Sequence, residues 1–374
     1  MKKLLALMLA LAMVFALAAC GGGGSNNASN ASSDGSKVGV FWYSASDSFL
    51  STVRTALNEE LDAAGIEYQD YDGNNNQATQ LEQIQTAVTN GFNVLVVNLV
   101  NSGSADAAQQ VIDAANGLPV IFFNRAVEGD GEEGTVLNAN DNIAFIGTDA
   151  PEAGHIQGKM IGEFLLENYD AVDLNGDGQI SYAMFMGDAS NVEAIYRTQY
   201  GVEDANAVLT AAGKPALVYF NASNSDGYQL DPNGAWSSAA ANEFMSVNLA
   251  EYSEANGNMI EIVIANNDDM SLGAIEALGS AGYNLGDGNS TKIPVFGVDA
   301  TQNAQDAIAA DKMTGTVLQS NTGYATAIRG AVEAVIAGSN PADACASVAA
   351  SDDLYDMAEG FSNKMLMHYL PVTG

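Results

Sequence analysis

The sequence is poor in the residues that cross-link chains or carry much of enzyme chemistry. It contains two cysteines, two histidines and 12 lysine or arginine residues, against 46 aspartate or glutamate residues. Two cysteines do not make a disulfide framework. The histidines, His155 and His368, lie far apart in no metal-binding spacing. The formal net charge of -34 excludes nucleic acid as a partner and favours neutral or cationic ligands over anions.

Familiar catalytic signatures are also missing. The chain has no P-loop and no GxSxG elbow. Because the chain has many carboxylates, their number alone does not exclude the pair of catalytic acidic residues that a glycosidase needs. No nucleophile is paired with a base in the pattern, so a binding protein is favoured over an enzyme.

One long apolar run is present, at the N-terminus. Residues 4–19 follow a basic start, which predicts a secretory signal peptide over residues 1–19. The run ends in LAAC, which resembles the bacterial lipobox and predicts a lipid anchor on Cys20. Residues 20–36 are rich in Gly, Ser and Asn and predict a flexible tether. An uncleaved membrane helix and a plain secreted protein are the alternatives.

The rest of the chain is expected to be a soluble body outside the cytoplasm, because no later segment has the length of a membrane span. With Cys20 lipidated, Cys345 has no partner and is expected to be a small buried apolar residue.

From residue 37, β-rich runs alternate with runs of helical spacing. Strands are expected at residues 38–43, 66–72, 94–100, 118–124 and 144–149, then in ISYAMFMG, LVYFN, IEIVIANND, IPVFGVD and the tail MLMHYLPV. This alternation predicts an α/β fold with parallel sheets and helices on both faces. At ~150 residues per domain, the length predicts two lobes of one architecture.

Polar residues follow several of these strands, namely Asn124, Asn266, Asn267, Asp268 and Asp299. Ligands of open parallel sheets bind beyond the carboxyl ends of the strands, so these residues are first candidates for a site. Asn and Asp also terminate strands and cap helices, and that alternative stays open here.

The stretch DLNGDGQIS, residues 173–181, has oxygen-bearing side chains at alternate positions and a glycine at the sixth. This is the opening of a calcium loop of the EF-hand type. The twelfth position, which should carry a clamping carboxylate, is Met184. Either the stretch is a turn without metal, or the carboxylate comes from elsewhere in the fold.

Together these motifs resemble the periplasmic galactose/glucose-binding proteins of ABC sugar transport. VIFFN, DLNGDGQI, IEIVIANNDDMSLGAIEAL, IPVFGVDA and GTVL occur in the family's order. The resemblance implies the two-lobed periplasmic-binding-protein fold, in which a hinge crossed three times lets the lobes close over a sugar. It implies a first lobe of residues 37–148 plus 320–355 and a second of residues 149–319 plus 356–374, with the third crossing around residues 350–360.

The resemblance also implies a partner and a ligand. The protein should be a monomer that binds a neutral monosaccharide, glucose or galactose first, and delivers it to the transmembrane subunits of an ABC permease. A sugar sensor that presents its bound form to a chemoreceptor is an alternative, as is another pyranose such as xylose.

Ten sugar-binding residues follow from the resemblance. Phe49 and Trp236 match the aromatic residues on the two apolar faces of the sugar ring. The polar rim is matched by Asp47, Asn124, Arg197, Asn267 and Asp299, and by Asn191, Glu193 and Gln319, where the family has histidine, aspartate and asparagine. From its own pattern, Arg197 would be placed on the exposed side of a helix and Phe49 in the core.

The resemblance further implies a structural calcium ion in the second lobe. Its ligands would be Asp173, Asn175, Asp177, Gln179 through its backbone carbonyl, Ser181 and Glu261. Glu261 supplies the missing carboxylate from a distant strand. The family has glutamine where Ser181 stands, so a water molecule or weaker binding is implied at that place.

Overall fold

The computed structural model describes residues 35–129 and 131–373. The predicted signal peptide, Cys20 and most of the tether lie outside the described residues. Across the part that is described, the helices are too short or too polar to cross a membrane.

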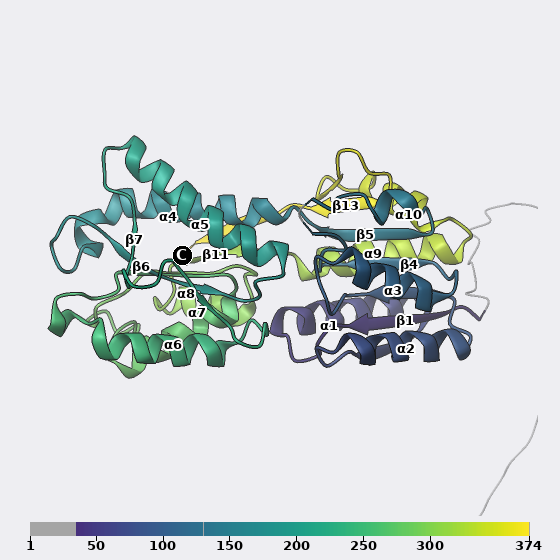
Figure 1. Cartoon of the computed structure of the whole chain (residues 1–374), viewed down its shortest axis with the longest axis horizontal. Coiled ribbons are helices and arrows are strands. Elements are labelled where there is room, and N and C mark those ends of the chain that lie inside the picture. The colour runs from purple at the N-terminus through teal and green to yellow at the C-terminus, as the bar shows by residue number, and fades with distance from the viewer. Residues whose placement is uncertain (1–34, 130, 374) are drawn as a thin grey trace, which may run out of the picture. The chain divides into compact units, whose positions relative to one another are not determined.

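The first sheet has the strand order β12-β13-β5-β4-β3-β1-β2 (Figure 1). All neighbours are parallel except β12 and β13. The strands are β1 (Lys37–Trp42), β2 (Glu67–Asp72), β3 (Val94–Val97), β4 (Val120–Phe123), β5 (Ile143–Thr148), β12 (Tyr355–Met357) and β13 (Lys364–Met367). One face is covered by α1 (Ser48–Ala64), α9 (Asn321–Ile336) and α10 (Pro341–Ala349), the other by α2 (Gln77–Thr89) and α3 (Ala105–Ala115).

The second sheet has the order β14-β11-β10-β9-β6-β7, and β8 also pairs with β6. Its strands are β6 (Ser181–Met186), β7 (Val218–Tyr219), β8 (Gln229–Leu230), β9 (Ile262–Ala265), β10 (Val295–Phe296), β11 (Gly315–Leu318) and β14 (Leu370–Thr373). One face is covered by α4 (Ala150–Val172) and α5 (Val192–Ala211), the other by α6 (Ser238–Glu251), α7 (Asp268–Ser280) and α8 (Gln302–Ala309). Short 3₁₀ turns occur at Leu137–Ala139 and Glu254–Asn256.

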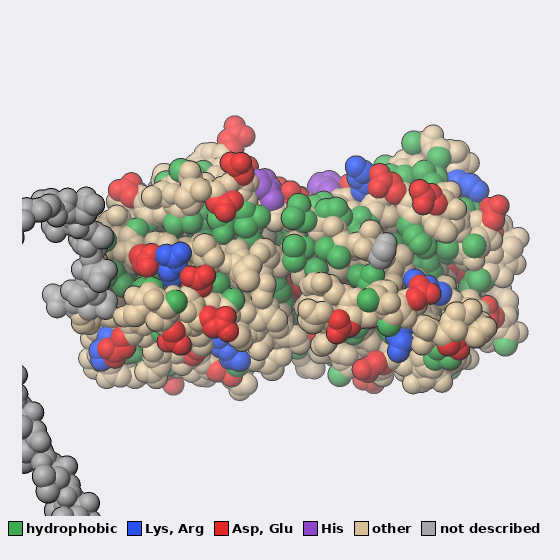
Figure 2. Space-filling model, turned by 180° about the vertical axis from the view of Figure 1, so that it is seen from behind, with side chains coloured by type: hydrophobic (Ala, Val, Ile, Leu, Met, Phe, Trp, Pro, Cys, Tyr) green, Lys and Arg blue, Asp and Glu red, His purple; other side chains and the backbone are tan. Residues whose placement is uncertain are grey.

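Strand composition follows position in the sheet. The central strands β3 and β4 read VLVV and VIFF, and all eight residues are buried because helices cover both faces. The edge strand β2 reads EYQDYD and has no buried residue. Acidic side chains are spread over the face of the molecule that Figure 2 shows. The predicted α/β fold of two lobes, each with a largely parallel sheet, is confirmed.

The third crossing between the lobes is not where the sequence predicted it. Both β12 and β13 belong to the first sheet, and only β14 lies in the second. The crossing therefore falls at residues 368–369, and the assignment of residues 356–367 to the second lobe was wrong. The tail MLMHYLPV is not one strand, because β13 pairs with β5 and β14 pairs with β11.

His368 sits at this crossing between carboxylates of both lobes. Its Nδ1 lies 3.4 Å from Glu152 Oε1 on α4, and its Nε2 lies 3.0 Å from Asp356 Oδ2 on β12. Partial burial alone would lower the pKa of His368, but hydrogen bonds and charge attraction from Glu152 and Asp356 outweigh it and raise the pKa.

We predict that His368→Gln removes a pH-dependent part of the stability. A raised folded-state pKa stabilises the fold fully below the unfolded value of about 6.5, and the contribution is lost as pH rises through the folded pKa. The loss should be below about 1 kcal/mol, because the ring is partly exposed. Thermal unfolding near pH ~5.5 and pH ~8.5 should show the larger gap between wild type and variant at the lower pH. Equal differences in melting temperature at the two pH values would contradict a stabilising role for protonated His368.

Candidate ligand-binding site

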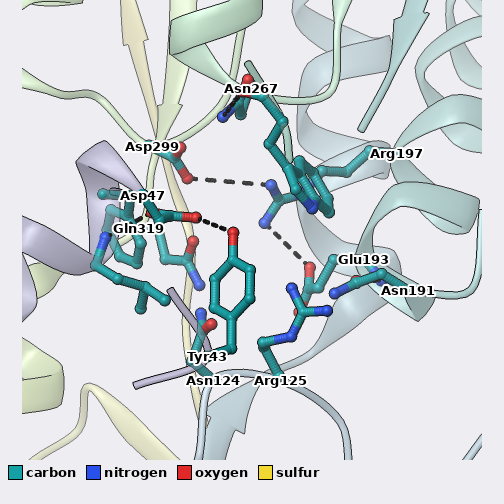
Figure 3. A pocket seen from close by; sticks show the side chains of 13 residues that line it. Tyr43, Asp47, Asn124, Arg125, Asn191, Glu193, Arg197, Asn267, Asp299 and Gln319 are labelled. Atoms are coloured by element: carbon teal, nitrogen blue, oxygen red, sulfur yellow. Dashed lines mark hydrogen bonds and ion pairs between the residues drawn. The ribbon is translucent and has the colours of Figure 1, made fainter. Parts of the chain in front are cut away.

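A pocket is formed by segments that follow the carboxyl ends of strands in both sheets, as expected for a parallel α/β fold (Figure 3). The empty space between its walls, open solvent included, is about 430 Å³. All ten residues predicted to contact a sugar line it. The full lining is Tyr43, Asp47, Phe49, Leu50, Asn124, Arg125, Asn191, Glu193, Arg197, Trp236, Asn267, Asp299 and Gln319.

Several residues that line the pocket also cap helices. Helix capping and a place at a ligand site are therefore compatible roles for the same side chain. Asp47 Oδ1 accepts from Leu50 N at 2.8 Å at the start of α1. Asn267 Oδ1 accepts from Met270 N at 3.0 Å, while its Nδ2 donates to the Trp236 carbonyl at 3.2 Å. Capping holds these side chains at the rim of the pocket in one orientation.

The other two strand-end candidates, Asn266 and Asp268, are fully buried and do not line the pocket. Asp268 accepts hydrogen bonds from Thr301 and Thr316. Burial raises its pKa to about 7.

Arg197 is the central cation of the site. Only 3% of it is exposed, although its sequence pattern alone indicated a surface position. Its Nη1 donates to the Asn266 carbonyl at 3.0 Å, and its Nη2 donates to Tyr369 Oη at 2.8 Å and to Glu193 Oε2 at 3.1 Å. Burial would lower the pKa of Arg197, but Tyr369, Glu193 and Asp299 raise it, so the guanidinium stays charged.

Asp299 faces the same guanidinium, with its Oδ1 4.0 Å from Arg197 Nη1 (Figure 3). Its backbone φ of 120° is unusual for a residue with a side chain. Burial raises the pKa of Asp299 well above its usual range, Arg197 opposes this rise, and nearby carboxylates add to it. The carboxyl group is therefore held where a hydrogen-bonding ligand can meet it.

The two aromatic residues predicted for the ring faces come from different lobes. Phe49 begins α1 in the first lobe, and Trp236 precedes α6 in the second. Trp236 adopts a left-handed backbone with φ of 55°. A Cβ atom on Gly187 would lie 2.2 Å from the indole ring, so only glycine lets the ring pack flat on the end of β6.

Tyr43 and Arg125 were not predicted from the sequence. Tyr43 Oη donates to Asp47 Oδ2 at 2.8 Å, and the Arg125 guanidinium lies 4.1 Å from the centre of the Tyr43 ring. Arg125 Nη2 also pairs with Asp188 Oδ2 of the second lobe at 3.2 Å. This pair joins the lobes beside the pocket. Arg125 could have been suspected, because it follows Asn124 directly in a chain with few basic residues.

Glu193 lines the pocket and also contacts two residues of the segments that connect the lobes. Its Oε1 accepts from Thr148 Oγ1 at 2.8 Å, and its Oε2 lies 2.9 Å from Tyr369 Oη. Asn191, the cap of α5, reaches Ser102 Oγ across the lobes at 3.5 Å. Gln319 Nε2 donates to Tyr324 Oη at 3.1 Å.

The loop of residues 173–181 and Glu261 lie together, as the calcium prediction required. Glu261 is fully buried, and its carboxylate accepts from the backbone of Leu174 at 2.9 Å and of Ser181 at 2.8 Å. Asp173 accepts from Gly176 and Gly178. Within residues 35–129 and 131–373, no group of three or more Cys, His, Asp or Glu side chains is arranged to hold a metal ion. Side-chain oxygens of Asp173, Asn175 and Asp177 accept hydrogen bonds from backbone N–H groups of the loop.

The lining of the pocket offers aromatic surface and hydrogen-bonding groups from both lobes. Cys345 is buried in the first lobe, as predicted, and burial raises the pKa of its thiol to about 12. Aromatic side chains and a rim of amides, carboxylates and the guanidinium groups of Arg125 and Arg197 can hold a small, hydroxyl-rich ring.

Fold and pocket together define a two-lobed solute-binding protein. Residues 38–340 match the model of a protein family that is described as a periplasmic binding protein domain. The chain belongs to this family, whose members are extracytoplasmic solute receptors of transport systems and not enzymes.

Curated relatives cover most of the chain. It is 31% identical over 295 residues to the D-galactose/methyl-galactoside-binding periplasmic protein of Haemophilus influenzae. The aligned region covers 78% of this chain and 79% of that protein. It is 26% identical over 312 residues to a putative rhizopine-binding protein of Rhizobium meliloti. Here the aligned region covers 83% of this chain and 85% of that protein.

Solved structures share the fold. A Bacillus halodurans ABC transporter solute-binding protein with bound myo-inositol gives a TM-score of 0.64 at 23% identity, covering 92% of this chain and 96% of that one. A Clostridium phytofermentans solute-binding protein with bound β-D-glucose gives 0.65 at 19% identity, covering 90% and 94%. At these identities the likeness concerns the fold alone.

Proposed function

We propose that the pocket binds one neutral monosaccharide, with glucose and galactose as first candidates, and that the protein delivers it to the permease of an ABC importer. One observation carries the proposal. Aromatic side chains from both lobes and a rim of hydrogen-bonded polar groups line one pocket. The galactose-binding relative and the inositol- and glucose-bound neighbours support a ring rich in hydroxyl groups.

The identity of the sugar depends on three positions. Asn191, Glu193 and Gln319 differ from the residues of galactose/glucose-binding proteins, and each lies at the pocket. Xylose or another pyranose is therefore the second candidate. A sensor that presents the bound form to a chemoreceptor is the second candidate for the role. Loss of uptake on deletion supports transport, whereas loss of chemotaxis or gene induction alone supports sensing.

We predict that one sugar of a panel binds with a stoichiometry of one per chain. The panel is glucose, galactose, xylose, ribose, arabinose and myo-inositol, measured by thermal shift and then by isothermal titration. A ligand that binds only the folded state must raise the melting temperature. Trp236→Ala should weaken binding of the best sugar at least tenfold, about 1.4 kcal/mol, because one ring face loses its aromatic cover.

The second tryptophan provides the matched control. Trp42 is buried in the first lobe, where its indole donates to Asp70 at 2.7 Å, and it does not line the pocket. Trp42→Phe should keep the affinity, and its remaining tryptophan fluorescence should still respond to sugar. No shift with any sugar of the panel would contradict the proposed function.

We also propose that the loop of residues 173–181 and Glu261 hold a structural calcium ion. Burial raises the pKa of Glu261, and backbone hydrogen bonds from Ser181, Asn175 and Leu174 only partly offset this rise. No lysine or arginine is among the hydrogen-bond or ion-pair partners of the described Glu261 side chain. A hard cation with oxygen ligands would stabilise this buried carboxylate, with Asp173, Asn175, Asp177, Ser181 and the Gln179 carbonyl as its other ligands.

We predict that a chelator lowers the melting temperature of the wild type and that added calcium restores it. Binding to the folded state alone gives this shift. Glu261→Gln should lose the response. Asp287→Asn is the control, because Asp287 caps another exposed glycine-rich turn of the same lobe through Asn289 N and Ser290 N. It should keep the response. If a chelator leaves the melting temperature of the wild type unchanged, the proposed calcium site is contradicted.

Finally, we propose that Cys20 carries a lipid that anchors the protein to the membrane. The lipobox-like LAAC and the polar tether that follows it support this proposal. Cys20→Ser should move the protein from the membrane fraction to the soluble fraction of the cells. Retention of the variant in the membrane fraction would contradict the anchor.

A further inference from the structure

The hydroxyl of Tyr369 lies at a junction of three groups. Arg197 Nη2 is 2.8 Å from Tyr369 Oη, Thr148 Oγ1 is 2.9 Å away and Glu193 Oε2 is 2.9 Å away. Tyr369 is 2% exposed and is not among the residues that line the pocket. A ligand in the pocket would meet Arg197 and Glu193 but not the tyrosine behind them.

These contacts close into a ring. Tyr369 has one hydroxyl proton and can donate to one acceptor at a time. Arg197 donates to Tyr369, Tyr369 to Thr148 and Thr148 to Glu193 Oε1, while Glu193 Oε2 pairs with Arg197 at 3.1 Å. In this arrangement each hydroxyl of the ring both donates and accepts, whereas the buried Nε of Arg197 has no hydrogen-bond partner among the described residues.

The ring joins two of the three crossings between the lobes. Thr148 is the last residue of β5, at the first crossing, and Tyr369 lies at the third, between β13 and β14. Glu193 and Arg197 lie on the first turns of α5 and line the pocket. A movement at either crossing must therefore shift or break bonds to these two side chains.

We propose that Tyr369 is a positioning residue for ligand binding, which ties the guanidinium of Arg197 to the first and third crossings through Thr148 and Glu193. This inference rests on the proposed sugar-binding function. Glu193 serves the hinge and the pocket together, because its Oε1 accepts from Thr148 while its Oε2 pairs with Arg197.

The test removes single hydroxyl groups that do not line the ligand pocket. Tyr369→Phe and Thr148→Val each delete one member of the ring with little change in volume. The control is Tyr355→Phe, because the buried hydroxyl of Tyr355 donates to the Gly323 carbonyl at 2.8 Å within the first lobe. For each variant, the melting temperature without sugar and the Kd for the best sugar of the panel are measured.

We expect Tyr369→Phe to raise the Kd about tenfold and Thr148→Val to raise it in the same direction. The double variant should lose less than the sum of the two in free energy, because both act on one network. Tyr355→Phe should lower the melting temperature and leave the Kd unchanged. If Tyr369→Phe does not fold, Thr148→Val carries the same test.

Two outcomes separate this inference from the function on which it rests. If the wild type binds a sugar and Tyr369→Phe lowers only the melting temperature, with its Kd within about twofold of the wild type, the positioning role is wrong and the binding function stands. If the wild type binds no sugar of the panel, the proposed function fails, and the positioning role falls with it.

Discussion

A guanidinium sealed from bulk water is the constraint on which the site depends. An unpaired charge in such a place destabilises a fold by several kcal/mol, so Arg197 requires partners with fixed geometry. It finds them in Glu193, Asp299, the Asn266 carbonyl and Tyr369. These groups come from α5, the ends of β9 and β10, and the third crossing. The partners of this one cation therefore tie four segments together around the pocket.

Most of the fold could be predicted from the sequence because burial on both faces leaves a local mark. VLVV and VIFF are continuous apolar runs, and Gly65 ends α1 in the left-handed conformation that glycine adopts without strain. The third crossing carried no such mark. MLMHYLPV is apolar enough to form one strand, and its division into β13 and β14 depends on pairing with β5 and β11, more than 40 residues away along the chain. Local pattern does not encode partners at that distance.

The site divides in the same way. Asn124, Asn267 and Asp299 were found because polar residues after strands mark the carboxyl edge of a sheet, whereas Asp47 and Asn191 were predicted through the resemblance. The burial of Arg197 was invisible to its own helix pattern, because Tyr369 lies 172 residues away in sequence. The role of Tyr369 had no local signal at all. Glu193 was placed at the pocket by resemblance, but its bonds to Thr148 and Tyr369 appear only when the two crossings are brought side by side.

We propose that this cation and the two aromatic residues together hold one sugar ring. A crystal structure of the protein with the sugar that gives the largest thermal shift tests this arrangement. We expect the sugar ring to lie between Phe49 and Trp236, with a hydroxyl group within hydrogen-bond distance of Arg197. A sugar bound elsewhere, or bound in this pocket without contact to Arg197, would contradict it.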